Sequence, residues 1–214
     1  MIIPYCSWTG TKTSLRALRQ AGWRVLTGPP ILMRNAWAPP KWDDGTIAPF
    51  GLDNGAWTAH QQEEPFDAAG FEKAFAAVGR LADWVVVPDI VGGGADSLEF
   101  TTSWLPRLQG HRLLLVAVQD GMEPDDVASL LGPRVGVFLG GTTEWKLSTM
   151  DIWGQLTKKV DCHYHVGRVN TVNRIMRCKH AGADSIDGTS VTRFACNLPR
   201  LEHACRQLNM FTEK

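Results

Sequence analysis

The sequence predicts a compact, single-domain (β/α)8 barrel, and two observations lead to this fold class. Eight short apolar runs alternate along the chain with stretches of helical periodicity, an order that favours a parallel sheet with crossover helices. Several runs are continuous, such as Trp84–Val87, and continuous runs are typical of parallel strands buried on both faces. Although 214 residues is near the lower size limit of such barrels, residues 1–214 are expected to form one barrel domain.

The strands are predicted where β-branched, aliphatic and aromatic residues gather between turn-forming residues. In chain order they are Ile2–Tyr5, Arg24–Leu26, Phe50–Asp53, Trp84–Pro88, Leu113–Val118, Val135–Leu139, His163–Val166 and Ser185–Asp187.

Helices are predicted between these strands. The clearest covers Asp67–Arg80, where Phe71, Ala74, Phe75 and Val78 form one apolar stripe and Asp67 stands near the start. The others are expected over Ser14–Gln20, Asp96–Leu108, Pro124–Leu131, Glu144–Gln155, Thr171–His180 and Leu198–Leu208. The exception is Thr27–Pro49, which is rich in proline and is expected to be a long loop without a helix, placed where it could cover the site.

Composition and charge limit the classes of function. The chain is 44% apolar and 21% charged with a formal net charge of +0, which argues against non-specific adhesion to nucleic acid. Residues 1–140 carry 11 Lys and Arg against 15 Asp and Glu, whereas residues 141–214 carry 11 against 7. The balance is therefore −4 in the first part and +4 in the second, which suggests that the later part contacts a polyanion.

The cysteines and the N-terminus predict a cytoplasmic protein. The five cysteines are odd in number, scattered and without a Cys-x-x-Cys pair, a pattern that indicates a reducing compartment: Cys6, Cys162, Cys178, Cys196 and Cys205. The first residues lack the basic region and apolar stretch of a signal peptide. No run approaches the ~20 apolar residues that span a bilayer, so no membrane partner is expected.

Six of the apolar runs end in polar residues or glycines that could bind a ligand. These ends are Asp53, Asp89, Gln119, the pair Gly140-Gly141, Gly167 and Asp187. Because a closed parallel barrel brings the C-terminal ends of its strands to one face, where active sites lie, these residues are expected to meet. Two carboxylates, a third acid, an amide and a glycine pair could then hold a purine, since carboxylates suit its N–H donors and amides its carbonyl.

Each of these residues also has a purely structural interpretation. Asp187 could be a nucleophile, a metal ligand or the cap of the following turn. Asp53 could be an acid/base with Trp57 as an aromatic surface, or it could bond the backbone of the Asn54-Gly55 turn. The Gly92–Gly94 run after Asp89 could cradle phosphate, but it lacks the spacing of known phosphate fingerprints.

The segment Cys162-His163-Tyr164-His165 contains three potential metal ligands. Strand alternation places His163 and His165 on one face and Cys162 on the other, so the three cannot easily converge. Packed histidines are therefore favoured over zinc, and no metal is expected.

Together these segments resemble the queuine/archaeosine tRNA-guanine transglycosylase family over residues 50–193. Leu52–Trp57 is similar to the family's Asp-Ser-Gly-Gly-Phe segment, and Pro88-Asp89 to the acid that reads the guanine edge. Val118–Gly121 resembles Val-Gln-Gly-Gly, Leu139–Gly141 the glycine strand end, and His165–Gly167 the Gly-Val-Gly stretch. Asp187 with Thr192-Arg193 matches the Asp-to-Arg spacing of Phe-Asp-Cys-x-x-Pro-Thr-Arg.

The chain departs from the tRNA enzymes in ways that point to another branch. It lacks their Cys-x-Cys-x-x-Cys…His zinc site and RNA-binding insertion, and Asn54, Ala56 and Val191 replace Ser, Gly and Pro of the family motifs. A shorter, zinc-less chain resembles the DNA-acting branch, the DpdA-type transglycosylases of phages and bacteria that install 7-deazaguanines in DNA.

The resemblance implies a set of roles. Asp187 would be the nucleophile and Asp53 the acid/base. The base would be bound by Asp89, Gln119, Gly140, Gly141, Trp57 and Asn54, and the nucleic acid by Arg193, with Arg168 and Lys146 as weaker candidates. DNA would be the substrate, with tRNA as the alternative, and a free guanine or preQ0-like 7-deazaguanine the co-substrate, without any other cofactor. A homodimer or an accessory DNA-modification protein stays open as a partner.

Two other classes of function remain. One is a barrel lyase, isomerase or hydrolase that acts on a small phosphorylated sugar, with Gly92–Gly94 as its phosphate loop. The other is a catalytically silent subunit that only holds nucleic acid or a catalytic homologue. The presence of Asp53, Asp89 and Asp187 together argues against the silent subunit.

Overall fold

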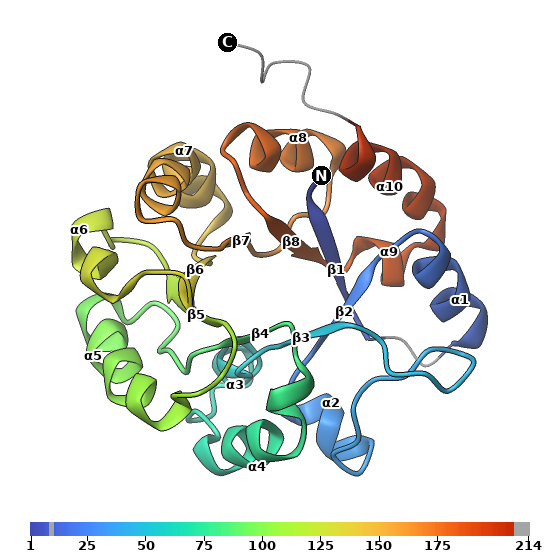
Figure 1. Cartoon of the computed structure of the whole chain (residues 1–214), viewed down its shortest axis with the longest axis horizontal. Helices are drawn as coiled ribbons and strands as arrows, with labels where there is room; N and C mark the ends of the chain where they lie inside the picture. Colours follow the sequence, from blue (N-terminus) through green and yellow to red (C-terminus); the bar gives the residue numbers. More distant parts are fainter. Residues whose placement is uncertain (9–10, 208–214) are drawn as a thin grey trace.

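The computed structural model, which describes residues 1–8 and 11–207, is a closed barrel of eight parallel strands ringed by helices (Figure 1). The strands follow one another around the barrel in chain order: β1 Ile3–Ser7, β2 Arg24–Thr27, β3 Phe50–Leu52, β4 Trp84–Val86, β5 Leu114–Val118, β6 Val135–Leu139, β7 Tyr164–Val166 and β8 Ser185–Gly188. Each predicted strand is present, with ends that differ by at most two residues. The predicted (β/α)8 fold is thus confirmed.

Helices connect the strands on the outside of the barrel. They are α1 Lys12–Gln20, α2 Pro29–Arg34, α3 Ala56–Gln61, α4 Ala68–Val78, α5 Gly94–Trp104, α6 Pro124–Val127, α7 Thr143–Val160, α8 Val172–His180, α9 Ser190–Arg193 and α10 Leu198–Arg206. Short 3-10 turns follow four of them: Gly79–Leu81, Leu105–Leu108, Ala128–Leu130 and Ala195–Asn197. Seven helices coincide with predicted ones, and the predicted end at Leu208 lies outside the described residues.

The prediction that Thr27–Pro49 contains no helix is wrong. Gly28 precedes α2, and the two prolines that follow occupy its first turn, where a missing N–H costs nothing and the fixed φ suits a helix. After α2, Trp37 contacts Lys73 of α4, and Asp43 accepts a hydrogen bond from Arg16 of α1 at 2.8 Å. No residue of 28–49 lines the cavity described below, so this segment does not cover the site.

The barrel interior is filled by large side chains. Trp84 crosses it and meets the Tyr5 ring edge-on at 5.0 Å between centroids, and Val86, Leu115 and Ala117 complete this inner cluster. The indole fits because residue 51 is glycine: a Cβ there would lie 2.4 Å from the Trp84 ring. The larger apolar cluster lies between the strands and the helices around them. The barrel is therefore a packed core and leaves room for a ligand only at its end.

Across the described residues, no helix combines the length and the apolar character needed to cross a membrane.

Candidate functional site

A cavity of about 810 Å³ opens at the C-terminal end of the barrel. Its volume is in the range of small-molecule sites. Every strand contributes a lining residue near its C-terminal end: Ser7, Leu26, Asp53, Asp89, Gln119, Gly140, Gly167 and Asp187. The expectation that the polar strand ends meet at one face therefore holds for Asp53, Asp89, Gln119, Gly140, Gly141, Gly167 and Asp187, all of which line this cavity.

Asp187 lines the cavity, is 6% exposed, and has a hydrogen-bonding partner at each of its carboxylate oxygens. Its Oδ1 accepts from the backbone N–H of Arg168 at 3.1 Å, and its Oδ2 lies 3.0 Å from His165 Nε2. Gly167 permits this approach, because a Cβ there would lie 3.3 Å from Oδ2 and 2.9 Å from the Phe138 ring. The carboxylate is thus held in one orientation.

Asn170, rather than Asp187, caps the turn that follows β8. Its Oδ1 accepts from the backbone N–H groups of Thr189 and Ser190, both at 2.9 Å. The interpretation of Asp187 as the cap of this turn is therefore wrong, and its carboxylate is directed into the cavity. The sequence analysis missed Asn170, whose only signal was an asparagine four residues after the end of β7.

Asp53 bonds the backbone of the Asn54-Gly55 turn, as one of its two interpretations predicted, and it also lines the cavity. Its Oδ1 accepts from the backbone N–H of Gly55 at 2.7 Å, which closes the turn before α3, and the half-buried side chain also lines the cavity. Burial, together with the nearby carboxylates of Asp187 and Asp89, raises its pKa to about 6. A carboxyl with this pKa is protonated in part of the molecules at neutral pH and can donate a proton.

Asn54 positions Asp89. Its amide nitrogen donates to the Val87 carbonyl at 2.8 Å and to Asp89 Oδ1 at 2.7 Å, and its oxygen accepts from Ala56 N–H at 2.8 Å. Burial raises the pKa of Asp89 to about 6, although the bond from Asn54 opposes the shift. Asn54 therefore connects the ends of β3 and β4 and orients the second acid of the cavity.

Gln119 braces the loop between β4 and α5. Its amide nitrogen donates to the Ile90 carbonyl at 2.7 Å and to Ser97 Oγ at 3.0 Å, and its oxygen accepts from Gly92 N–H at 2.6 Å. Both amide hydrogens are thus used within the protein, and only an oxygen lone pair remains for a ligand. Gly93 N–H also donates inside this loop, to the Ile90 carbonyl at 2.9 Å, so two of the three glycine N–H groups are not available to a phosphate.

Trp57 and Arg168 meet across the mouth of the cavity. Trp57 follows β3 and is 41% exposed, and Arg168 follows β7, four strands away on the opposite side of the barrel. The Arg168 guanidinium carbon lies 4.4 Å from the centre of the Trp57 ring, and its Nη2 also donates to the Gly141 carbonyl. A flat ligand that stacks on this face of the Trp57 ring must displace the guanidinium.

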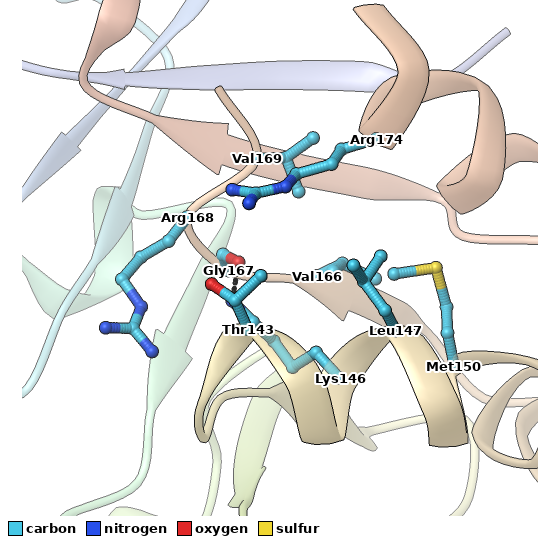
Figure 2. Close-up of a pocket in the computed structure, with 9 residues that line it drawn as sticks. All are labelled: Thr143, Lys146, Leu147, Met150, Val166, Gly167, Arg168, Val169 and Arg174. Atoms are coloured by element: carbon cyan, nitrogen blue, oxygen red, sulfur yellow. Dashed lines mark hydrogen bonds between the residues drawn. The ribbon is translucent and has the colours of Figure 1, made fainter. Parts of the chain in front are cut away.

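The three predicted nucleic-acid-binding cations differ in accessibility. Arg193 is exposed at the edge of the cavity, whereas Lys146 is 4% exposed and donates to the Gly167 carbonyl. Figure 2 shows Lys146 extending from α7 beneath the Gly167 loop, while Arg168 points away from it. Burial and the neighbouring Arg168 lower the pKa of Lys146 to about 8. Lys146 therefore supports the loop that carries Gly167 and Arg168.

The two histidines share one serine hydroxyl. His163 Nε2 and His165 Nδ1 each lie 2.7 Å from Ser185 Oγ, which agrees with the prediction that both histidines occupy one face. Within residues 1–8 and 11–207, no group of three or more His, Cys, Asp or Glu side chains is placed to hold a metal ion. The hydrogen bond from His165 to Asp187 is a feature that sequence reasoning missed.

No protein-family model matches this chain, and no curated protein matches it. The resemblance to transglycosylases therefore rests on the sequence motifs alone.

Proposed function

We propose that this protein is a guanine transglycosylase that exchanges a guanine in DNA for a 7-deazaguanine of the preQ0 type. The observation that carries the proposal is the pairing of two different carboxyl groups in one cavity. Asp187 is held by the Arg168 backbone N–H and the His165 ring, while Asp53 has a pKa raised to about 6. A retaining glycosyl transfer needs one carboxylate as nucleophile and one carboxylic acid to protonate the leaving group.

The exchange proceeds by two displacements. In the first, an oxygen of Asp187 attacks C1′ of the sugar, the C1′–N9 bond breaks, and its electron pair stays on the leaving guanine, which takes a proton from Asp53. In the second, the incoming 7-deazaguanine gives its N9 proton to Asp53 and attacks C1′, and the bond to Asp187 breaks. Both carboxyl groups thus return to their starting states.

The remaining lining residues suit a purine and its strand. Trp57 offers a face for stacking, and Asp89, held by Asn54, offers an acceptor for the N–H groups along the base edge. Gly141 also lines the cavity, and the exposed Arg193, a further lining residue, could contact a phosphate of the strand. A base in a duplex must be flipped out to enter, at a cost of a few kcal/mol.

The test is incorporation of radiolabelled guanine into duplex DNA, single-stranded DNA or bulk tRNA. Label in either form of DNA supports the proposal, and label in tRNA alone overturns the choice of DNA. Label in none of the three polymers overturns the transglycosylase. The Asp187→Asn variant should incorporate no label and form no covalent adduct, and Asp53→Asn should be slower by about 10²- to 10⁴-fold.

Asp161→Asn is the matched control for these variants. It makes the same chemical change at an exposed position after α7 whose left-handed conformation asparagine tolerates, so it should keep full activity. Full base exchange by Asp187→Asn would contradict the assignment of the nucleophile.

A further inference from the structure

We infer that His165 is a positioning residue for Asp187, and that Ser185 and His163 set the proton on its ring. This inference rests on the proposed function, because it assigns His165 a part in the two displacements at Asp187. Its basis is a continuous chain of contacts inside the barrel. His163 Nε2 and His165 Nδ1 each lie 2.7 Å from Ser185 Oγ, and His165 Nε2 lies 3.0 Å from Asp187 Oδ2.

With one proton on each imidazole, all three of these contacts can be hydrogen bonds beside an ionised Asp187 in a single arrangement of protons. An ionised carboxylate only accepts, so His165 must carry its proton on Nε2. The Nδ1 atom of the neutral ring then accepts from the Ser185 hydroxyl, whose oxygen in turn accepts from His163 Nε2–H. Burial, and then the proximity of His165, lower the pKa of His163 to about 4, so His163 is a neutral imidazole at neutral pH and has a single ring proton to donate to Ser185.

Packing keeps the His165 ring in place. The side chain is fully buried, stacked on Phe138 at 4.8 Å and 22°, and flanked by Trp84 at 4.7 Å and Tyr5 at 5.9 Å between centroids. Among the described residues, Asp187 is the only carboxylate within hydrogen-bonding distance of this ring. The ring therefore presents one N–H to one oxygen of the nucleophile, from a site with little freedom to turn.

This contact acts on both displacements. With the Arg168 N–H on the other oxygen, it fixes the plane of the carboxylate relative to the cavity before attack on C1′. In the second displacement Asp187 leaves as a carboxylate, and the His165 N–H stabilises the charge that develops on it. Loss of the N–H should therefore lower kcat more than it raises KM for the free base.

The experiment compares three substitutions at His165 and Ser185 with one control substitution. His165→Phe keeps a flat ring but removes the donor, His165→Gln keeps an N–H near the position of Nε2, and Ser185→Ala removes the hydroxyl that sets the ring proton. His180→Gln, on the exposed end of α8, is the control. We expect kcat to fall on the order of 10- to 100-fold in His165→Phe, the effect of a lost charge-assisted hydrogen bond, with partial recovery in His165→Gln.

The amount of folded enzyme and the position of the His165 ring proton distinguish a positioning role for His165 from a merely structural one. A structural role would lower the amount of folded enzyme and leave kcat per folded molecule unchanged, whereas positioning lowers kcat in folded molecules with KM within about twofold. In ¹⁵N NMR, His165 should carry its proton on Nε2, and its signals should shift in Asp187→Asn. Wild-type kcat in folded His165→Phe, or a proton on Nδ1 of His165, would overturn the inference.

The NMR measurement also separates the two proposals. If the wild-type protein transfers no base to any polymer, the proposed function fails. The ¹⁵N spectra then decide alone whether His165 donates to Asp187.

Discussion

The substitution Asp89→Asn measures how far the buried carboxylate of Asp89 lowers the free energy of unfolding. The side chain is 9% exposed, and burial raises the pKa of its carboxyl to about 6. The substitution Asp89→Asn changes little else, because an amide oxygen can still accept the hydrogen bond that Asn54 donates at 2.7 Å. The variant thus removes a buried charge and keeps its shape and its partner.

The sign and size of the effect follow from linkage. A carboxyl with a higher pKa in the folded state confers stability that is complete below its unfolded value near 4 and is lost as the pH rises through about 6. A difference of about two pKa units corresponds to about 3 kcal/mol. At pH 8 we therefore expect Asp89→Asn to be more stable than the wild type by about 1–3 kcal/mol, and at pH 4 by less than about 1 kcal/mol.

Urea unfolding of both proteins at pH 4 and pH 8 measures this difference. The control is Asp161→Asn, an exposed carboxyl on the surface, whose substitution should change the free energy of unfolding by less than about 0.5 kcal/mol at either pH. Equal stability of Asp89→Asn and the wild type at pH 8, with unchanged m values, would refute the reasoning. It would mean that the Asp89 carboxylate is solvated or paired despite its burial.

Two other substitutions test the supports of the site. Ser97→Ala removes the hydroxyl that accepts from Ile90 N–H and Gln119 Nε2, both at 3.0 Å. Urea unfolding should show a free energy of unfolding lower by about 1–2 kcal/mol. The control Thr102→Ala, on the exposed side of the same helix, should lower it by less. Gly167→Ala places a Cβ 2.9 Å from the Phe138 ring and should destabilise by about 1–3 kcal/mol and slow base exchange. Wild-type stability and activity of Gly167→Ala would show that the end of β7 can shift without displacing Asp187.

The strands were predictable because their pattern is local. Continuous apolar runs between turn residues mark strands buried on both faces, and all eight were found on this basis. Local sequence features also explain why α2 and α9 were not predicted. Pro29 and Pro30 indicate a loop unless their fit to a first helical turn is considered. α9 has four residues, too few to show a helical period.

The sequence predicted which residues line the cavity better than it predicted the hydrogen bonds between them. Asp53, Asp89 and Asp187 share the cavity because the ends of parallel strands meet. That both amide hydrogens of Gln119 are used by Ile90 and Ser97 depends on the path of one loop, which no pattern in the sequence encodes. The contact of His165 with Asp187 was hidden for another reason: in a strand buried on both faces, alternation does not say which face points into the barrel.

The closure of the barrel by β1 and β8 makes the site a property of nearly the whole chain. Tyr5 pairs in register with Asp187, so the strand that carries Asp187 is hydrogen-bonded to the first strand of the protein. These contacts span almost the full sequence separation available, and such contacts are slow to form. A chain that stops after α8 would leave β1 and β7 as open edges, which invite association with other chains. The Asp187 carboxylate therefore takes its position in the cavity only when β8 pairs with both β7 and β1.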